Sequence, residues 1–183
     1  MSDFNAPQVF KLSGVYNLPV GTGQTLLRSN NWFNKQVIGG WQLSDILTVQ
    51  SGLPFNVGAN DLSDTGGYHA QRANRICNGN HPANQSITHW FNTACYVQPG
   101  EGQLGTEGRD DLIGPRTTNL DLSLFKQFPF MEDKFVQFRS DFFDALNHPL
   151  LGNPNAYTTS PVNGKITNIT GARDIQLSLK VIF

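Results

Sequence analysis

Charge is scarce in this sequence. Lysine, arginine, aspartate and glutamate make up 15% of its 183 residues, whereas soluble domains average roughly 25%. The formal net charge is -1, so electrostatics gives no reason to expect a nucleic acid as partner. No apolar run approaches the roughly 18 residues of a membrane-spanning helix, and helical periodicity is absent over any useful length. A helical membrane protein and a nucleic-acid-binding protein are therefore both disfavoured.

Cysteines and targeting signals are equally sparse. The two cysteines, Cys77 and Cys95, lie in one loop-like stretch and can pair as a disulfide, which requires an oxidising compartment. The first seven residues contain neither a positively charged region nor an apolar core, so we expect no signal peptide. Taken alone, this second feature favours a cytoplasmic protein. A missing segment upstream of Met1 would remove the conflict between the two features.

The sequence is instead rich in uncharged polar residues (Asn, Gln, Ser and Thr). It also contains 18 glycines and 20 aromatic residues, of which 13 are phenylalanines. This composition suits strands and long loops better than helices. Alternation with period 2, the mark of a strand with one apolar face, is clearest in residues 173–183. All apolar side chains there except Ile182 share one face: Ile175, Leu177, Leu179, Val181 and Phe183.

Similar alternation occurs in residues 10–18, 37–50, 119–127 and 134–144. Ten residues at roughly 3.3 Å each, tilted by about 45°, span about 25 Å, which is the height of the apolar band of an outer-membrane barrel. The sequence therefore predicts an all-β fold, an antiparallel meander of about five long strands that forms part of a transmembrane β-barrel.

The connections between these segments are unequal. Residues 128–133 predict a short turn, whereas residues 51–118 and 145–172 are long and rich in Gly, Pro and Asn. Bacterial barrels combine short periplasmic turns with long outer loops. If the chain ends on the periplasmic side, both long connections lie outside the cell.

The polar faces of the strands are expected to line the barrel lumen, where they can bond to a plug or a passing solute. The candidate lumen-facing residues are Lys11, Gln42, Gln137, Arg139, Asp141, Gln176 and Lys180. Candidates for interfacial aromatic girdles are Tyr16, Trp41, Phe128, Phe130 and Phe183.

A soluble β-sandwich is the alternative, because its strands also alternate between apolar and polar residues. Asp45 favours the sandwich, since it falls within the apolar face of Trp41, Leu43 and Leu47. A carboxylate that faces lipid at mid-depth is unfavourable, unless a bulge turns Asp45 inward.

Several stretches, in order, resemble one family, the TonB-dependent receptors. The matching stretches are VYNLPVG (15–21), GGWQLS (39–44), QSGLPF (50–55), RANR (72–75), WFN (90–92), GP (114–115), NLDLSLFK (119–126), QFRSDFF (137–143), NHP (147–149) and IQLSLKVIF (175–183). They resemble most the Oar-like branch, whose barrels follow a carboxypeptidase-regulatory-like domain.

The resemblance implies that residues 1–183 are the C-terminal portion of a barrel of about 22 strands with a plugged lumen. The plug, the TonB-contacting segment and a signal peptide are expected upstream. The terminal stretch resembles the signal for membrane insertion, carried by Ile175, Leu177, Leu179, Val181 and Phe183. The implied partners are the rest of the barrel and plug, the TonB system, the barrel-assembly machinery, outer-membrane lipid and an unidentified solute, in the outer membrane of a bacterium.

No cofactor, metal or catalytic site is expected, so the chain is not expected to be an enzyme. Residues 100–105 (GEGQLG) match the dinucleotide-binding pattern, but Gly and Pro interrupt the segment where the required helix would begin. Cys77, Cys95 and two histidines lack the spacing of a zinc site. A Cys77–Cys95 disulfide that stabilises an otherwise floppy loop is the preferred interpretation.

A second functional hypothesis accompanies the sandwich fold. In that case the chain is a secreted binding module that contacts a glycan or a protein through the loop around Cys77 and Cys95. Trp90, Phe91 and Tyr96 would anchor the contact, since exposed aromatic side chains often dominate recognition.

Overall fold

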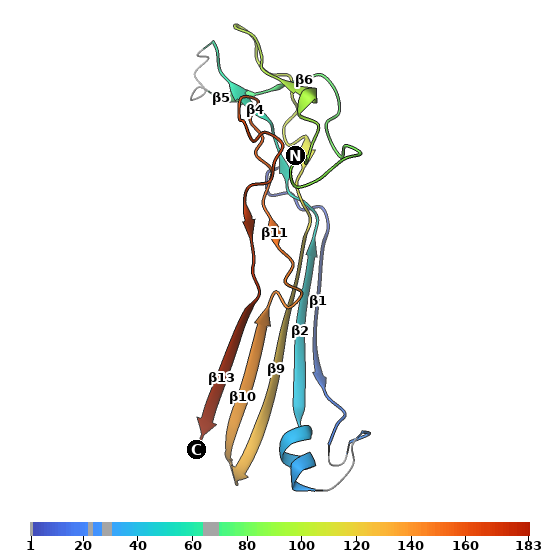
Figure 1. The fold of residues 1–183 in the computed structure, drawn as a ribbon, viewed down its shortest axis with the longest axis vertical. Helices are drawn as coiled ribbons and strands as arrows, with labels where there is room; N and C mark the ends of the chain where they lie inside the picture. The colour runs from blue at the N-terminus through green and yellow to red at the C-terminus, as the bar shows by residue number, and fades with distance from the viewer. Residues whose placement is uncertain (1, 22–23, 27–30, 64–69) are drawn as a thin grey trace. The chain divides into compact units, whose positions relative to one another are not determined.

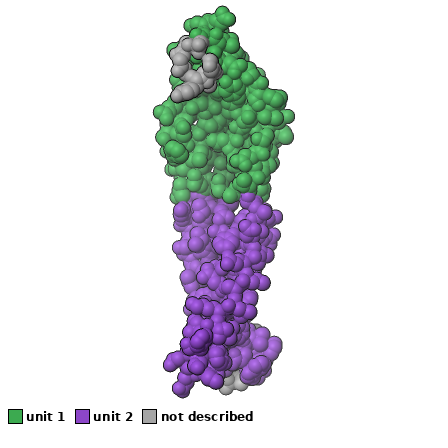
Figure 2. Space-filling model, turned by 90° about the vertical axis from the view of Figure 1, so that its left-hand side faces the viewer, with its two compact units in different colours: residues 1–9, 50–117, 149–170 green, residues 10–49, 118–148, 171–183 purple. Residues whose placement is uncertain are grey.

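The computed structural model describes residues 2–21, 24–26, 31–63 and 70–183. The chain divides into two compact units (Figure 2). We call Phe10–Val49, Thr118–His148 and Gly171–Phe183 the strand unit, and Met1–Val9, Gln50–Thr117 and Pro149–Thr170 the loop unit. Each unit is described by itself below.

The strand unit contains one five-stranded sheet in the order β1-β2-β9-β10-β13. Its strands are β1 (Val9–Asn17), β2 (Trp41–Gln50), β9 (Thr117–Met131), β10 (Lys134–Phe143) and β13 (Asp174–Ile182). Neighbouring strands run in opposite directions (Figure 1). The predicted fold class, an antiparallel all-β meander of about five long strands, is confirmed.

The turn between β9 and β10 is shorter than the predicted 128–133. Strand β9 continues to Met131, which pairs with Lys134 across Glu132 and Asp133. Asp133 adopts the left-handed conformation (φ 64°), which Asp tolerates better than most residues and which is common in turns. Pro129, which resembled a turn residue, lies inside the strand opposite Phe135, next to a register shift between Lys134 and Phe135. Such an irregularity is where a strand accommodates a residue without an N–H group.

Strand β2 starts at Trp41 and not at the predicted residue 37. The preceding segment is a short π-helix, η1 (Asn34–Ile38), that ends at Gly39. Gly40 has φ 76°, a conformation that favours glycine and interrupts extended backbone.

The predicted long loops are packed structures with a core, contrary to the expectation of a floppy excursion. Short strands pair as β3 (Pro54–Phe55) with β8 (Leu112–Ile113), β4 (Gly58–Asn60) with β5 (Ala70–Arg72), β6 (Asn74–Arg75) with β7 (Tyr96–Val97), and β11 (Leu150–Leu151) with β12 (Ile169–Thr170). A short 3₁₀ helix, η2 (Thr93–Cys95), precedes β7. The core of the loop unit consists of Phe55, Val57, Ala59, Ala73, Phe91, Cys95, Tyr96 and Leu112.

Phe91 is the centre of this core. Its ring contacts those of Phe55 and Tyr96 edge-on, with centroids 5.7 and 5.6 Å apart. Trp90 is partly buried against the cluster, and its indole N–H donates to the carbonyl of Ile113 at 2.9 Å. The aromatic residues proposed to anchor a partner therefore stabilise the loop unit itself.

Among the described residues, no helix has both the length and the apolar character needed to cross a membrane.

Candidate functional site

The register of β10 against β13 separates the two faces of the sheet. One face is formed by apolar pairs, Val136–Val181, Phe138–Leu179 and Phe142–Ile175. The other is formed by polar pairs, Gln137–Lys180, Arg139–Ser178 and Asp141–Gln176. Directly opposed residues share a face, so we call these the apolar face and the polar face.

Strands β9 and β2 continue the apolar face. On β9, Phe128 and Leu122 lie opposite Val136 and Phe142 of β10. On β2, the ring of Trp41 contacts that of Phe138 edge-on at 6.1 Å between centroids. The apolar face therefore runs from β2 across the sheet to β13.

The seven candidate lumen-facing residues all lie on the polar face. Gln42 follows Trp41 and so points to the opposite side, where its amide donates to Asn17 Oδ1 at 2.7 Å. Lys11 is six positions before Asn17 in β1 and shares its face. The remaining five are Gln137, Arg139, Asp141, Gln176 and Lys180, which the register of β10 and β13 places there.

On this face, polar contacts lie within β10 and between β10 and β9. Arg139 Nε lies 2.9 Å from both carboxylate oxygens of Asp141. The Ser123 hydroxyl donates to Asp141 Oδ1, and Ser123 lies opposite Asp141 in the register. The hydrogen bond from Ser123 to Asp141 cross-links β9 and β10.

We expect this ion pair to contribute little to stability. The Arg139 side chain is 52% exposed, and exposed pairs typically contribute about 0.2–1 kcal/mol. A double-mutant cycle with Arg139→Gln and Asp141→Asn, measured as the free energy of unfolding in lipid vesicles, should give a coupling energy in that range. A coupling of several kcal/mol would mean that the pair is shielded from water and does not line an aqueous lumen.

Three polar residues interrupt the apolar face: Asp45, Lys126 and Ser140. The position of Asp45 was left open by the sequence. It lies four positions after Trp41 in β2, and its Oδ1 lies 2.9 Å from where a side chain on Gly14 would begin. Gly14 is three positions from Asn17 and therefore faces the apolar side. Asp45 thus stays on the apolar face, above a glycine that makes room for it.

Lys126 is almost completely buried although it lies opposite Phe138 on this face. Its ammonium lies 4.9 Å from the ring centre of Phe128 and 5.5 Å from that of Trp41. Among the described residues the ammonium has no hydrogen-bond partner, so these cation–π contacts are what compensates for its lost hydration.

In the loop unit, Cys77 and Cys95 form a disulfide. Neither sulfur is then a thiolate, the form that binds zinc. In the part of the chain that the structure describes, no group of metal-binding side chains comes together. The GEGQLG stretch lies in turn and coil, where Gly105 N–H donates to Gln71 Oε1, and the next element along the chain is the two-residue strand β8.

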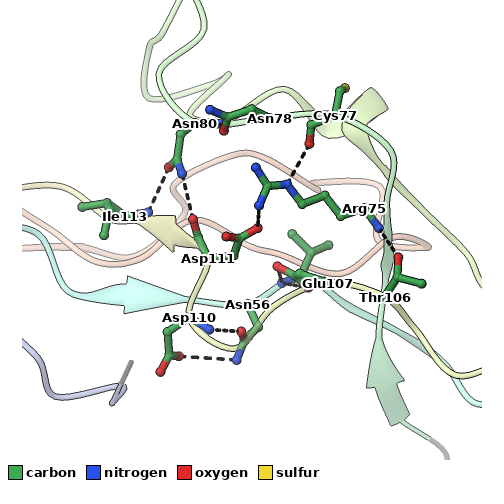
Figure 3. A network of polar contacts seen from close by, with 11 residues as sticks. Asn56, Arg75, Cys77, Asn78, Asn80, Thr106, Glu107, Asp110, Asp111 and Ile113 are labelled. Atoms are coloured by element: carbon green, nitrogen blue, oxygen red, sulfur yellow. Dashed lines mark hydrogen bonds and ion pairs between the residues drawn. The ribbon is translucent and has the colours of Figure 1, made fainter.

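A polar network includes the carbonyl of Cys77, one of the two disulfide-bonded residues (Figure 3). Arg75 donates to the carbonyl of Cys77 and forms an ion pair with Asp111. Asn80 donates to the carbonyl of Asp111 and accepts from the N–H of Ile113. These bonds tie the segment that carries Cys77 to the segment before β8, so the network holds the loop unit together.

Glu107 is the buried carboxylate of this unit. Both of its oxygens accept the N–H of Val57 at 2.9 Å, while its own N–H donates to Ala73. Burial is the main cause that raises the pKa of Glu107 to about 7 from its ordinary 4.5. The side chain therefore connects two segments of the core at the cost of placing a titrating group inside it.

This raised pKa predicts a pH-dependent stability of the loop unit. Between pH 4.5 and 7 the folded state binds more protons than the unfolded state, so stability falls as pH rises through this window and is constant above it. The shift corresponds to about 3 kcal/mol. In Glu107→Gln, which keeps an acceptor for Val57, this component should disappear when protease susceptibility is measured against pH.

Glu101→Gln is the matched control, because Glu101 is exposed and its replacement should leave the pH profile unchanged. If Glu107→Gln retained the wild-type profile between pH 4.5 and 7, the carboxylate would not titrate in that range.

The strand unit is thus a sheet with one apolar and one polar face, and the loop unit has a core of its own. Comparison with known families finds a match to an outer membrane beta barrel domain over residues 1–176. The chain belongs to this family. It is therefore a barrel domain of the bacterial outer membrane, and the family match decides against the soluble sandwich. No curated protein and no solved structure matches the chain.

Membership in the barrel family gives an expectation for the environments of the two faces. The apolar face of such a barrel meets lipid and the polar face meets the interior. Sequence reasoning missed Glu107 and the exceptional burial of Lys126. The signal for Lys126 was present, since its position in the alternation of residues 119–127 is an apolar one; for Glu107 there was no local signal, because its partner Val57 is fifty residues away in the chain.

Proposed function

We propose that the chain supplies the C-terminal wall of a TonB-dependent outer-membrane receptor that transports a solute with energy from the inner membrane. The observation that carries the proposal is the ordered set of receptor-like stretches, from residues 15–21 to the terminal 175–183, in a chain of the outer-membrane barrel family. In this proposal the polar face lines the lumen around a plug, and the loop unit contributes to the surface that first meets the solute.

Strand β13 has a second role in this proposal. The insertion-signal residues Ile175, Leu177, Leu179, Val181 and Phe183 are between 56% and 92% exposed. They form a continuous apolar stripe that ends in an aromatic residue. Such a stripe suits recognition by the barrel-assembly machinery before the strand meets lipid.

The proposed role is transport without catalysis. The polar contacts described on the sheet are an ion pair within β10 and side-chain hydrogen bonds between strands, and those of the loop unit hold its segments together. The remaining barrel strands, the plug and TonB are the proposed protein partners.

The decisive experiment begins with the DNA upstream of Met1. We expect the reading frame to continue into further alternating strands, a plug and a signal peptide. The full product, purified in detergent, should bind the isolated periplasmic domain of TonB in a calorimetric titration, and deletion of its N-terminal TonB-contacting segment should abolish binding. A full product that folds as a barrel but does not bind TonB would overturn the receptor proposal and leave the barrel family intact.

A further inference from the structure

We propose that the segment from residue 31 to residue 38, just before β2, is an interfacial anchor that lies in the phospholipid headgroup region beside the apolar face. The segment includes η1 and joins β1 to β2 at the end of the sheet where β2 begins (Figure 1). The inference depends on membership in the barrel family and not on the proposed transport function.

The first observation is an excess of exposed apolar surface on a short segment. Trp32 is 74% exposed, Phe33 54% and Val37 42%. Lys35, in the last turn of η1, is exposed beside them. Trp and Phe next to a basic side chain are the residues enriched at membrane interfaces, because the rings prefer the headgroup boundary and the cation favours phosphate.

The second observation is that the backbone of this segment is well fixed, so the exposure does not come from an unfolded loop. Asn34 N–H donates to Asn31 Oδ1 at 2.8 Å, and Gly39 N–H donates to the carbonyl of Asn34 at 2.8 Å. Gly21 packs so closely on Gly39 that a side chain added to it would begin 2.4 Å from the Gly39 Cα atom. The apolar side chains therefore project from a closed, bonded base.

The third observation places the segment on the lipid side of the sheet. Trp41 points to the apolar face, where its ring contacts Phe138. The indole N–H of the same side chain donates to the carbonyl of Val37 at 2.8 Å. The end of η1 is therefore attached to the apolar face, which is the face that meets lipid.

Lys126 indicates the depth of this contact. It lies on the apolar face, buried beside the rings of Trp41 and Phe128, and lysine on the outer side of a barrel is tolerated best near the membrane interface. Its position among Trp41 and Phe128 is that of an aromatic belt. The anchor ends just before Trp41 in the chain, so in this proposal it lies at headgroup level and extends the lipid contact of the barrel.

The test measures the lipid exposure of Trp32 in the whole protein, reconstituted in phosphatidylcholine vesicles. The emission of wild type minus that of Trp32→Phe reports Trp32 alone. One set of lipids carries bromine near the headgroup end of an acyl chain and the other near its methyl end. We expect bromine near the headgroup to quench this emission more than bromine near the methyl end, with little quenching by aqueous acrylamide.

Ile76→Trp provides the matched control. Ile76 is 67% exposed in the loop unit, so the emission added by this substitution should be quenched by acrylamide and not by brominated lipid. Quenching of Trp32 by acrylamide alone would overturn the proposal, because the segment would then face water or a soluble partner. Resistance of Trp32 to both quenchers would also overturn it, because another part of the barrel would then cover the segment.

Discussion

The substitution Leu177→Arg should prevent stable insertion into the membrane, whereas Gln176→Arg should be tolerated. Leu177 lies opposite Ser140 and Gln176 lies opposite Asp141 in the same pair of strands. An arginine on the lipid face costs about 2–4 kcal/mol near the bilayer midplane. An arginine at position 176 instead faces the barrel interior, opposite a carboxylate. One step along the chain therefore reverses the expected outcome.

Folding into phospholipid vesicles without assembly machinery is the appropriate measurement, because it isolates lipid contact from recognition of the terminal strand. The folded fraction is read from the electrophoretic mobility of unheated samples, and the free energy of unfolding from a denaturant titration. If both variants lost the same stability, the assignment of the two faces would be wrong. If Gln176→Arg alone failed to insert, the faces would be reversed.

The strands could be predicted from the sequence because their signal is local. In β10 and β13 each side chain meets either lipid or interior, so every second residue is apolar, and the register observed between them preserves this pattern. Alternation left the side of Asp45 open, because a bulge in β2 would have turned it to the polar face. Its tolerance depends on Gly14 of the neighbouring strand, and no periodicity in β2 contains that information.

The strand ends were less predictable for the same reason. Val37 continues the alternation of Trp41 and Leu43, so pattern alone extends β2 through it. The positive φ of Gly40 prevents β2 from extending back beyond Trp41. The sequence alone does not show which conformation a glycine adopts. The predicted turn over residues 128–133 included Pro129, which lies inside β9 next to a register shift.

The loop unit could not be predicted, because its core is built from long-range contacts without periodicity. Phe55, Phe91 and Leu112 are each at least twenty residues apart, in segments rich in Gly and Pro. Its longest described strands contain three residues, too short to show alternation. The only long-range contact that the sequence predicted in this unit was the pairing of its two cysteines.

Removal of the disulfide should have the second largest effect, and it should be confined to the loop unit. The bridge closes a loop with a sequence separation of 18, for which the chain-entropy model predicts roughly 3 kcal/mol. Cys95 is buried in the core and Cys77 is exposed, so Cys77→Ser breaks the bridge without creating a cavity.

The small core makes this contribution important. It contains eight residues, and the strands around it are only two or three residues long, so little else compensates when the cross-link is lost. The population of the opened loop unit should rise by roughly a hundredfold, and protease cleavage between residues 77 and 95 should accelerate accordingly. Reductant should accelerate cleavage of the wild type to the same rate and leave Cys77→Ser unaffected.

The sheet is held by the hydrogen bonds between its strands and by its lipid contact, so the electrophoretic mobility of the unheated protein should not change. Equal cleavage of oxidised wild type and variant would mean that the polar network of Arg75, Asn80 and Asp111 is sufficient without the bridge.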